Sequence, residues 1–171
     1  MMIRGWTSRR RRRASGFVVA AALIGAAAAD ASHSTPPPPP PPGHGQVLVR
    51  VVRAPSDAAP IPEGEVKLDA VELHRAGAGP EEGWVPLPPL RPAFATVELM
   101  GGQVWVANAP VATGQFDRVR MGARGGPAIP LTLHLASGQW TTLTLEVRVQ
   151  PGLGRGPLSL ELRRARILTA Q

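Results

Sequence analysis

The stretch Thr142–Gln150, TLTLEVRVQ, decides the fold because apolar and polar residues alternate along its whole length. Leu143, Leu145, Val147 and Val149 fall on one side of an extended chain, while threonine, glutamate and arginine fall on the other. Successive side chains of a β-strand point to opposite faces of a sheet, so this pattern is typical of a strand with one buried face. The sequence therefore predicts a half-buried strand at this position.

A second alternating stretch, Ile129–Leu135, lies just before the first. Its isoleucine and leucines fall on one side, and Thr132 and His134 fall on the other. The residues Ala136–Gln139 separate the two stretches and include a glycine, which suits a short connection. We therefore expect the two stretches to pair as an antiparallel hairpin.

Further alternating segments extend the prediction over the rest of the chain, and the chain holds 19 glycines and 20 prolines, which favour turns over long helices. In the segment Val66–Arg75 the apolar residues switch from one face of the predicted strand to the other, and a β-bulge near Asp69–Ala70 would explain this switch. The tail Glu161–Leu168 fits a strand or a short helix, and the alternation of the leucines favours a strand. These predicted strands are Gln46–Arg53, Val66–Arg75, Thr96–Leu99, Gln103–Ala107, Phe116–Met121 and Leu158–Leu162.

Strands at short spacing with no convincing helix predict an all-β fold. We expect a single antiparallel β-sandwich domain, prealbumin- or immunoglobulin-like in architecture, over residues 45–171.

The N-terminal residues 1–31 have the layout of a signal peptide. Residues 4–13 are rich in arginine, residues 16–29 are uncharged and largely apolar, and small residues at Ala29 and Ala31 fit a cleavage site. A membrane-spanning helix is the alternative, but it needs about 20 apolar residues. The leader predicts an exported protein, periplasmic or secreted, that meets the membrane only during export; the Sec and twin-arginine routes both stay open.

Residues 32–44 form a proline-rich spacer with seven consecutive prolines at Pro36–Pro42. Because proline fixes φ and lacks an N–H donor, the run predicts a polyproline II rod of roughly 22 Å. A stalk is the favoured role, and a ligand for a proline-binding groove is the alternative. The chain has no cysteine, which excludes a lipid anchor on an N-terminal cysteine and argues for a released protein.

The net charge of +7 comes mainly from the leader. Residues 1–31 contain six of the 19 basic residues and one of the 12 acidic residues, which leaves 13 basic and 11 acidic residues in the remainder. A nucleic-acid partner is therefore not predicted.

Tryptophan gives the strongest binding signal, since four tryptophans occur in a chain with no tyrosine. Alternation places Trp105 and Trp140 on polar strand faces, where an exposed ring stacks on a sugar or anchors a protein partner. The alternative is that each ring covers an end of the core. Trp84 is a third candidate, and a structural role under a loop fits it better.

The sequence gives little indication of a catalytic site. The strand histidines His74 and His134 are both expected to point outward into solvent, which is the ordinary state of a surface histidine. A cleft that joined one of them to Glu72, Asp117 or Glu146 would indicate a hydrolase or a metal-dependent enzyme. No motif in the sequence predicts such a site, so we expect no enzyme, no metal and no cofactor.

Several short motifs, in order, resemble the bacterial domain of unknown function 4382 family. The resemblance covers roughly residues 45–168 and implies an exported, sandwich-like domain with no assigned activity. The chain departs from the family at Arg53, where aspartate is typical, in a shortened segment after Leu135, and in lacking the lipobox cysteine. The matching blocks are Val71–Gly77, Gly83–Val85, Thr96–Leu99, Gly114–Arg120 and Thr141–Val147.

Together these observations predict an exported, non-enzymatic β-sandwich that binds carbohydrate or protein or has a structural role at the cell envelope. The competing hypotheses are a hydrolase or metal-dependent enzyme using a surface histidine, and a scaffold whose strand edges pair with another subunit. The oligomeric state stays open.

Overall fold

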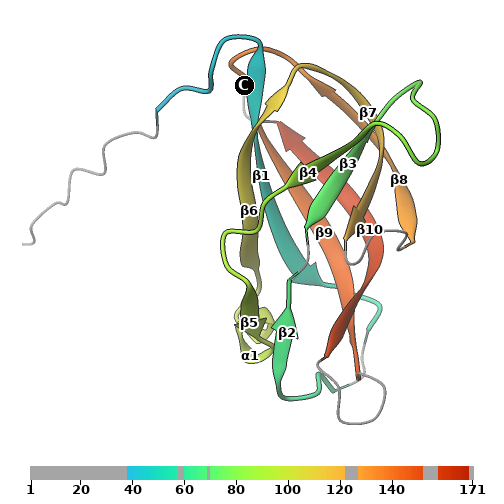
Figure 1. The fold of residues 1–171 in the computed structure, drawn as a ribbon. Coiled ribbons are helices and arrows are strands. Elements are labelled where there is room, and N and C mark those ends of the chain that lie inside the picture. The colour runs from blue at the N-terminus through green and yellow to red at the C-terminus, as the bar shows by residue number, and fades with distance from the viewer. Residues whose placement is uncertain (1–37, 58–59, 69, 122–126, 152–157, 170–171) are drawn as a thin grey trace, which may run out of the picture. The chain divides into compact units, whose positions relative to one another are not determined.

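Two four-stranded sheets pack face to face in the computed structural model, which describes residues 38–57, 60–68, 70–121, 127–151 and 158–169 (Figure 1). The predicted all-β sandwich is confirmed. In spatial order, sheet I contains β10 (Ser159–Thr169), β9 (Trp140–Gln150), β1 (His44–Arg53) and β6 (Val104–Ala112). Sheet II contains β4 (Trp84–Leu87), β3 (Val71–Arg75), β7 (Gly114–Met121) and β8 (Ala128–Leu135).

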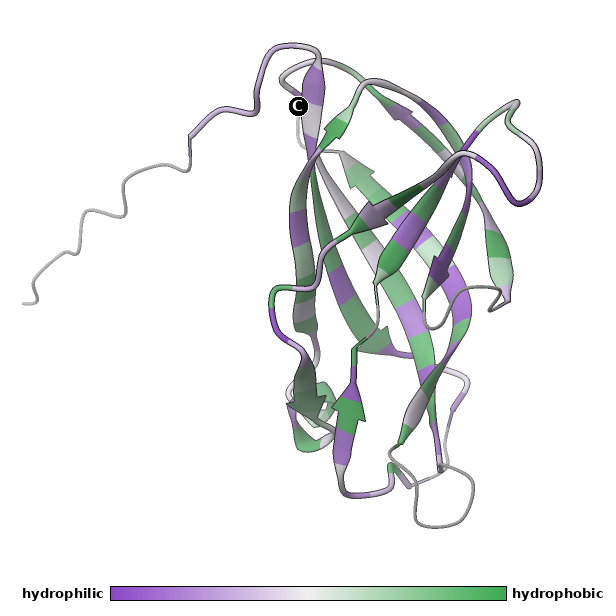
Figure 2. Ribbon diagram, in the orientation of Figure 1, coloured by the Kyte–Doolittle hydropathy of each residue, from purple (hydrophilic) through white to green (hydrophobic). Residues whose placement is uncertain are grey.

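The alternating residues of both sheets form one apolar core between them. Val47, Val49 and Val51 of β1 and Leu143 and Leu145 of β9 have no exposed surface. Burying a side chain of this size stabilises the fold by about 1.5–3 kcal/mol. Figure 2 shows the result as alternating hydrophobic and hydrophilic bands along the strands.

The predicted hairpin between Ile129–Leu135 and Thr142–Gln150 is wrong. β8 belongs to sheet II and pairs with β7, whereas β9 belongs to sheet I and pairs with β1 and β10. The connection Ala136–Gln139 therefore crosses from one sheet to the other, with Gly138 at a φ of 76°. Two strands with one apolar face each bury those faces equally well side by side or across a core, so alternation alone does not distinguish the arrangements.

The expectation of purely antiparallel pairing also fails at one place. β9 runs parallel to β1, from Gln46 opposite Trp140 to Arg53 opposite Val147. The other pairs within the two large sheets are antiparallel. The parallel pair follows from the crossing of the chain between sheets, which brings β9 alongside β1 in the same direction.

The segment Val66–Arg75 forms two strands instead of one bulged strand. β2 (Glu65–Lys67) pairs with β5 (Ala93–Ala95) in a small separate sheet, and β3 pairs with β4 and β7 in sheet II. Val66 and Leu73 are both fully buried because each strand has its own apolar face. The face switch seen in the sequence is therefore a change of sheet. Asp69, proposed as part of a bulge, lies outside the described residues.

The segment Thr96–Leu99, predicted as a strand, instead enters the short helix α1 (Val97–Met100). The Thr96 hydroxyl donates to Pro62 O at 2.8 Å and accepts from the N–H of Gly64 at 3.2 Å. Glu98 accepts from the N–H of Ala95 and from Arg91, whose hydrogen bond holds the pKa of Glu98 below its usual range. These local bonds stabilise a turn that a four-residue alternation does not reveal.

The C-terminal tail is the strand β10, as its leucine alternation predicted, and it extends to Thr169. At the other end, the predicted signal peptide and the first part of the spacer lie in residues 1–37, outside the described residues. The spacer residues from Pro38 lead to a turn at Pro42 and Gly43, where the N–H of His44 donates to Pro41 O. The part of the chain that the structure describes contains no helix long and apolar enough to cross a membrane.

Candidate functional site

The outer face of sheet I, turned away from the core, carries two of the predicted tryptophans. Trp105 on β6 lies opposite Arg50 of β1, and Trp140 on β9 lies opposite Gln46 of β1. A one-residue register shift follows Trp105, so that Val106 and Ala107 are both buried.

Trp105 is exposed and is held by a neighbouring arginine. Trp105 is 39% exposed to solvent, and the Arg50 guanidinium lies 5.7 Å from the centroid of its ring. Arg50 Nε also donates to Thr144 Oγ1 at 2.9 Å, and its Nη1 donates to Gln103 Oε1. Arg50 therefore bridges β6, β1 and β9, and it fixes the indole at the surface of the sheet.

Trp140 is half-buried and stands apart from Trp105. Four residues of β1 separate their partners, which corresponds to about 13 Å along the strand, and two strand gaps add about 10 Å across it. Between the two tryptophans lies half-buried Leu48 of β1, which is paired with Asn108 on one side and with Thr142 on the other. The two rings therefore share one face without forming a single aromatic cluster.

Trp84 belongs to sheet II and packs into a cluster of polar side chains. Its ring meets His74 edge-on with centroids 4.9 Å apart, and the Arg120 guanidinium lies 4.0 Å from its centroid. Its Nε1 donates to Pro80 O at 3.0 Å. Arg120 Nε in turn donates to the carboxylate of Glu72. The ring of Trp84 is therefore packed against side chains of its own domain.

The expectation that His74 is solvated is wrong, because the residue has no exposed surface. Nδ1 lies 2.7 Å from Asp117 Oδ1, and Nε2 lies 2.8 Å from Gly79 O. The hydrogen bond with His74 lowers the pKa of Asp117 below its ordinary value of 3.8, and Arg118 lowers it further. The loop after β3 and the ring of Trp84 cover the imidazole, although alternation had placed it correctly on the outer face of its sheet.

The contact between His74 and Asp117 has the composition of an acid–base pair, but its geometry differs. A general base needs a ring nitrogen within reach of a substrate proton. Both nitrogens of His74 already face oxygen acceptors, and the ring is buried. The contact braces the loop that contains Gly79 against β7.

His134 and Glu146 lie on different sheets. His134 is exposed on the outer face of sheet II, whereas Glu146 lies on the outer face of sheet I and pairs with Arg166 at 2.7 Å. Within the described ranges, no group of three or more histidine, aspartate or glutamate side chains could hold a metal ion.

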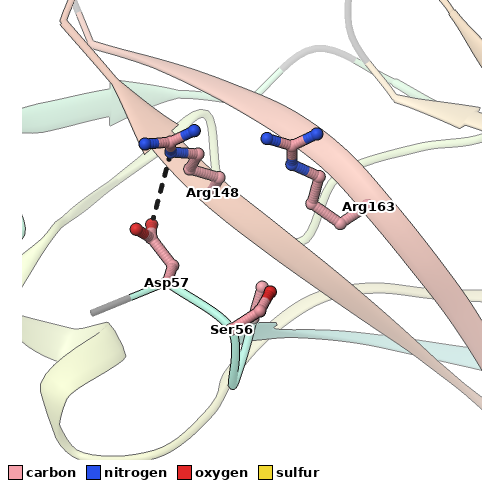
Figure 3. A pocket seen from close by; sticks show the side chains of 5 residues that line it. Ser56, Asp57, Arg148 and Arg163 are labelled. Atoms are coloured by element: carbon pink, nitrogen blue, oxygen red, sulfur yellow. Dashed lines mark ion pairs between the residues drawn. The ribbon is translucent and has the colours of Figure 1, made fainter. Parts of the chain in front are cut away.

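Sequence reasoning missed a pocket at the end of sheet I, lined by Ala54, Ser56, Asp57, Arg148 and Arg163, with a volume of about 330 Å³ (Figure 3). The guanidinium groups of both arginines lie side by side above the loop after β1, and a dashed line joins one of them to the aspartate. The only sequence signal was the arginine-rich composition of β10, which does not reveal where the side chains point.

Comparisons of the chain with protein-family models, with curated proteins and with solved structures found no match. The resemblance to the domain of unknown function 4382 family therefore stays a sequence-based prediction, and the functional argument rests on the geometry of the domain.

Proposed function

We propose that this domain is an exported, non-enzymatic binding module that holds a carbohydrate on the outer face of sheet I. The observation that carries the proposal is the exposed ring of Trp105, fixed by Arg50 among groups that form hydrogen bonds. The C–H face of a sugar ring stacks on an indole, while its hydroxyls need donors and acceptors beside the ring. The amide of exposed Gln103, two residues before Trp105, and the guanidinium of Arg50 supply such groups.

The separation of the two tryptophans favours an extended ligand. Trp105 and Trp140 flank β1 about 13 Å apart along the strand. A single sugar ring does not reach both, whereas an oligosaccharide does. The exposed Leu168 of β10, opposite Thr142, adds an apolar surface on the same face.

The non-enzymatic part of the proposal is supported by the state of His74. Its ring is buried and both nitrogens face acceptors, so it is poorly placed to exchange a proton with a ligand. The proposed location outside the cytoplasm is supported by the charged and apolar leader at residues 1–31 and by the proline run that follows.

A glycan array probed with the purified protein tests the proposal. We expect Trp105→Ala to weaken binding by about two- to twelvefold, because one stacked aromatic contact contributes about 0.5–1.5 kcal/mol. Met100→Ala removes a side chain that is 72% exposed on α1 and serves as the matched control.

Binding that survives Trp105→Ala unchanged would move the ligand off this face. If the wild-type protein binds no glycan but captures a protein in a Trp105-dependent way, the face is a protein interface, which is the other occupant that exposed tryptophan and arginine favour.

A further inference from the structure

We propose that the pocket between Arg148 and Arg163 binds an oxyanion group, namely a carboxylate, sulfate or phosphate, carried by the ligand of sheet I. The identification of that ligand as an acidic glycan rests on the proposed function. The anion site itself rests on an irregularity of β10, on the pocket and on the local charges.

The second arginine of the pocket, Arg163, lies at a β-bulge in β10. Glu161 lies opposite Arg148 and Leu162 lies opposite Val147, but the next pair joins Arg164 to Glu146. Arg163 is therefore the extra residue of the bulge. In a regular strand Arg163 would lie opposite Glu146. The bulge places Arg164 opposite Glu146 instead, and it leaves Arg163 and Arg164 both exposed.

The pocket presents the two arginines to solvent. The side chains of Arg148 and Arg163 are 44% and 45% exposed, and they come from adjacent strands. Figure 3 shows both guanidinium groups pointing the same way, with Ser56 below them. A guanidinium has five N–H donors in a planar fork, which suits the oxygens of a carboxylate, sulfate or phosphate.

Two carboxylates belong to the site and leave donors to spare. Arg148 Nε lies 3.7 Å from Asp57 Oδ2, and Arg163 Nη1 lies 3.0 Å from Glu161 Oε1. Each of these ion pairs engages one nitrogen of its arginine. The pocket lining itself contains two guanidinium groups and one carboxylate, that of Asp57, so an added anion meets more positive than negative charge there.

The pocket continues the face that carries Trp105. On β9, Arg148 lies four residues beyond Thr144, the residue that Arg50 binds beside the indole, which is about 13 Å along the strand. An extended chain stacked on the tryptophan therefore reaches the arginines. A polysaccharide with a carboxylate on its sugars satisfies both parts of the surface.

Affinity electrophoresis of the full chain in gels containing polygalacturonate, with dextran as the uncharged polymer, tests the site. We expect Arg148→Gln and Arg163→Gln each to weaken retardation by polygalacturonate about tenfold. Lys67→Gln removes one positive charge from an exposed position that does not line the pocket, and it should leave retardation unchanged. Circular dichroism checks that each variant is folded.

The outcomes separate the two proposals. The anion site would be overturned by equal retardation of the wild type and both arginine variants, or by an equal loss in Lys67→Gln. It would also be overturned if the wild type is not retarded and does not bind free sulfate. Loss in the arginine variants with full binding by Trp105→Ala would keep the anion site and overturn the stacking face. Loss of retardation in Trp105→Ala, with full retardation of both arginine variants, would keep the stacking face and overturn the anion site. Binding of free sulfate in isothermal titration calorimetry that is lost in both arginine variants, together with no polymer retardation, would reduce the site to a small-ion site and overturn the glycan carrier.

Discussion

The buried ion pair beneath Trp84 allows a sharp test of the structure. Arg120 and Glu72 have side chains only 9% and 11% exposed, and Arg120 also lies 4.0 Å from the Trp84 centroid. In the variant Arg120→Met, a side chain of similar length remains, but the carboxylate of Glu72 stays buried without its partner. Such a loss costs about 3–5 kcal/mol.

The size of the expected stability loss in Arg120→Met follows from how much of the Arg120 and Glu72 side chains is still exposed. Because about a tenth of each side chain still meets solvent, water relieves part of the penalty, and we expect the lower end, about 3 kcal/mol. For a domain of this size that corresponds to a fall in Tm of about 10 °C. Urea unfolding followed by far-UV circular dichroism measures the change.

The double variant Glu72→Met/Arg120→Met distinguishes a lost partner from lost packing. Removing both charges leaves no buried unpaired group, so the double variant should lie within about 1–2 kcal/mol of the wild type, with the remaining deficit due to the lost contact between the cation and Trp84. If Arg120→Met costs less than about 1 kcal/mol, or if the double variant is less stable than Arg120→Met alone, the reasoning is refuted.

Three further predictions concern the core, the acid response and the loop after β3. Leu145→Ala, at a residue with no exposed surface, should destabilise the domain by about 3 kcal/mol, whereas Leu168→Ala, at 55% exposure, should change stability by less than about 0.5 kcal/mol; chemical unfolding compares them. The pKa of Asp117 is lowered in the folded protein, so its charge stabilises the fold at a pH above the ordinary pKa of 3.8, and this stabilisation is lost as pH falls through the folded-state pKa. Asp117→Asn should therefore show a smaller loss of stability than the wild type below about pH 4. Unfolding curves over a pH series that do not differ between the two proteins would contradict this prediction. Gly83→Ala places a Cβ 2.4 Å from the Cβ of the neighbouring loop alanine at a φ of 73°, whereas Gly77→Ala at a φ of 83° meets nothing within 4 Å; thermal melts should show the first variant as the less stable.

Much of the local structure could be predicted because alternation reports which side of a strand is apolar. Val47, Val49 and Val51 form the buried face of the predicted strand Gln46–Arg53, and Trp105 faces outward as expected. The prediction failed where the same pattern fits two arrangements. The alternation of Thr96–Leu99 fits a strand, but bonds from Thr96 and Glu98 to nearby groups hold a turn instead.

The candidate site was predicted only in part. The sequence pointed to Trp105 and Trp140, but their separation across β1 depends on the register between strands far apart in the chain. His74 was placed on the correct side of its strand and was wrongly assigned to solvent, because alternation does not show that the next loop and Trp84 fold back over its ring. Arg163 lies near Arg148 because β10 pairs with β9, and the composition of β10 does not reveal which strand is its partner.

By itself, the sequence determined that the domain is built from strands, which residues form its core, and which strand faces are polar. Those properties follow from the two-residue period of an extended chain and from the cost of exposing apolar side chains to water. Only the tertiary structure decided that β8 and β9 lie in opposite sheets, that β9 runs parallel to β1, and that two arginines meet at a pocket. Those properties depend on pairing between distant segments, and an apolar face is buried equally well by more than one partner.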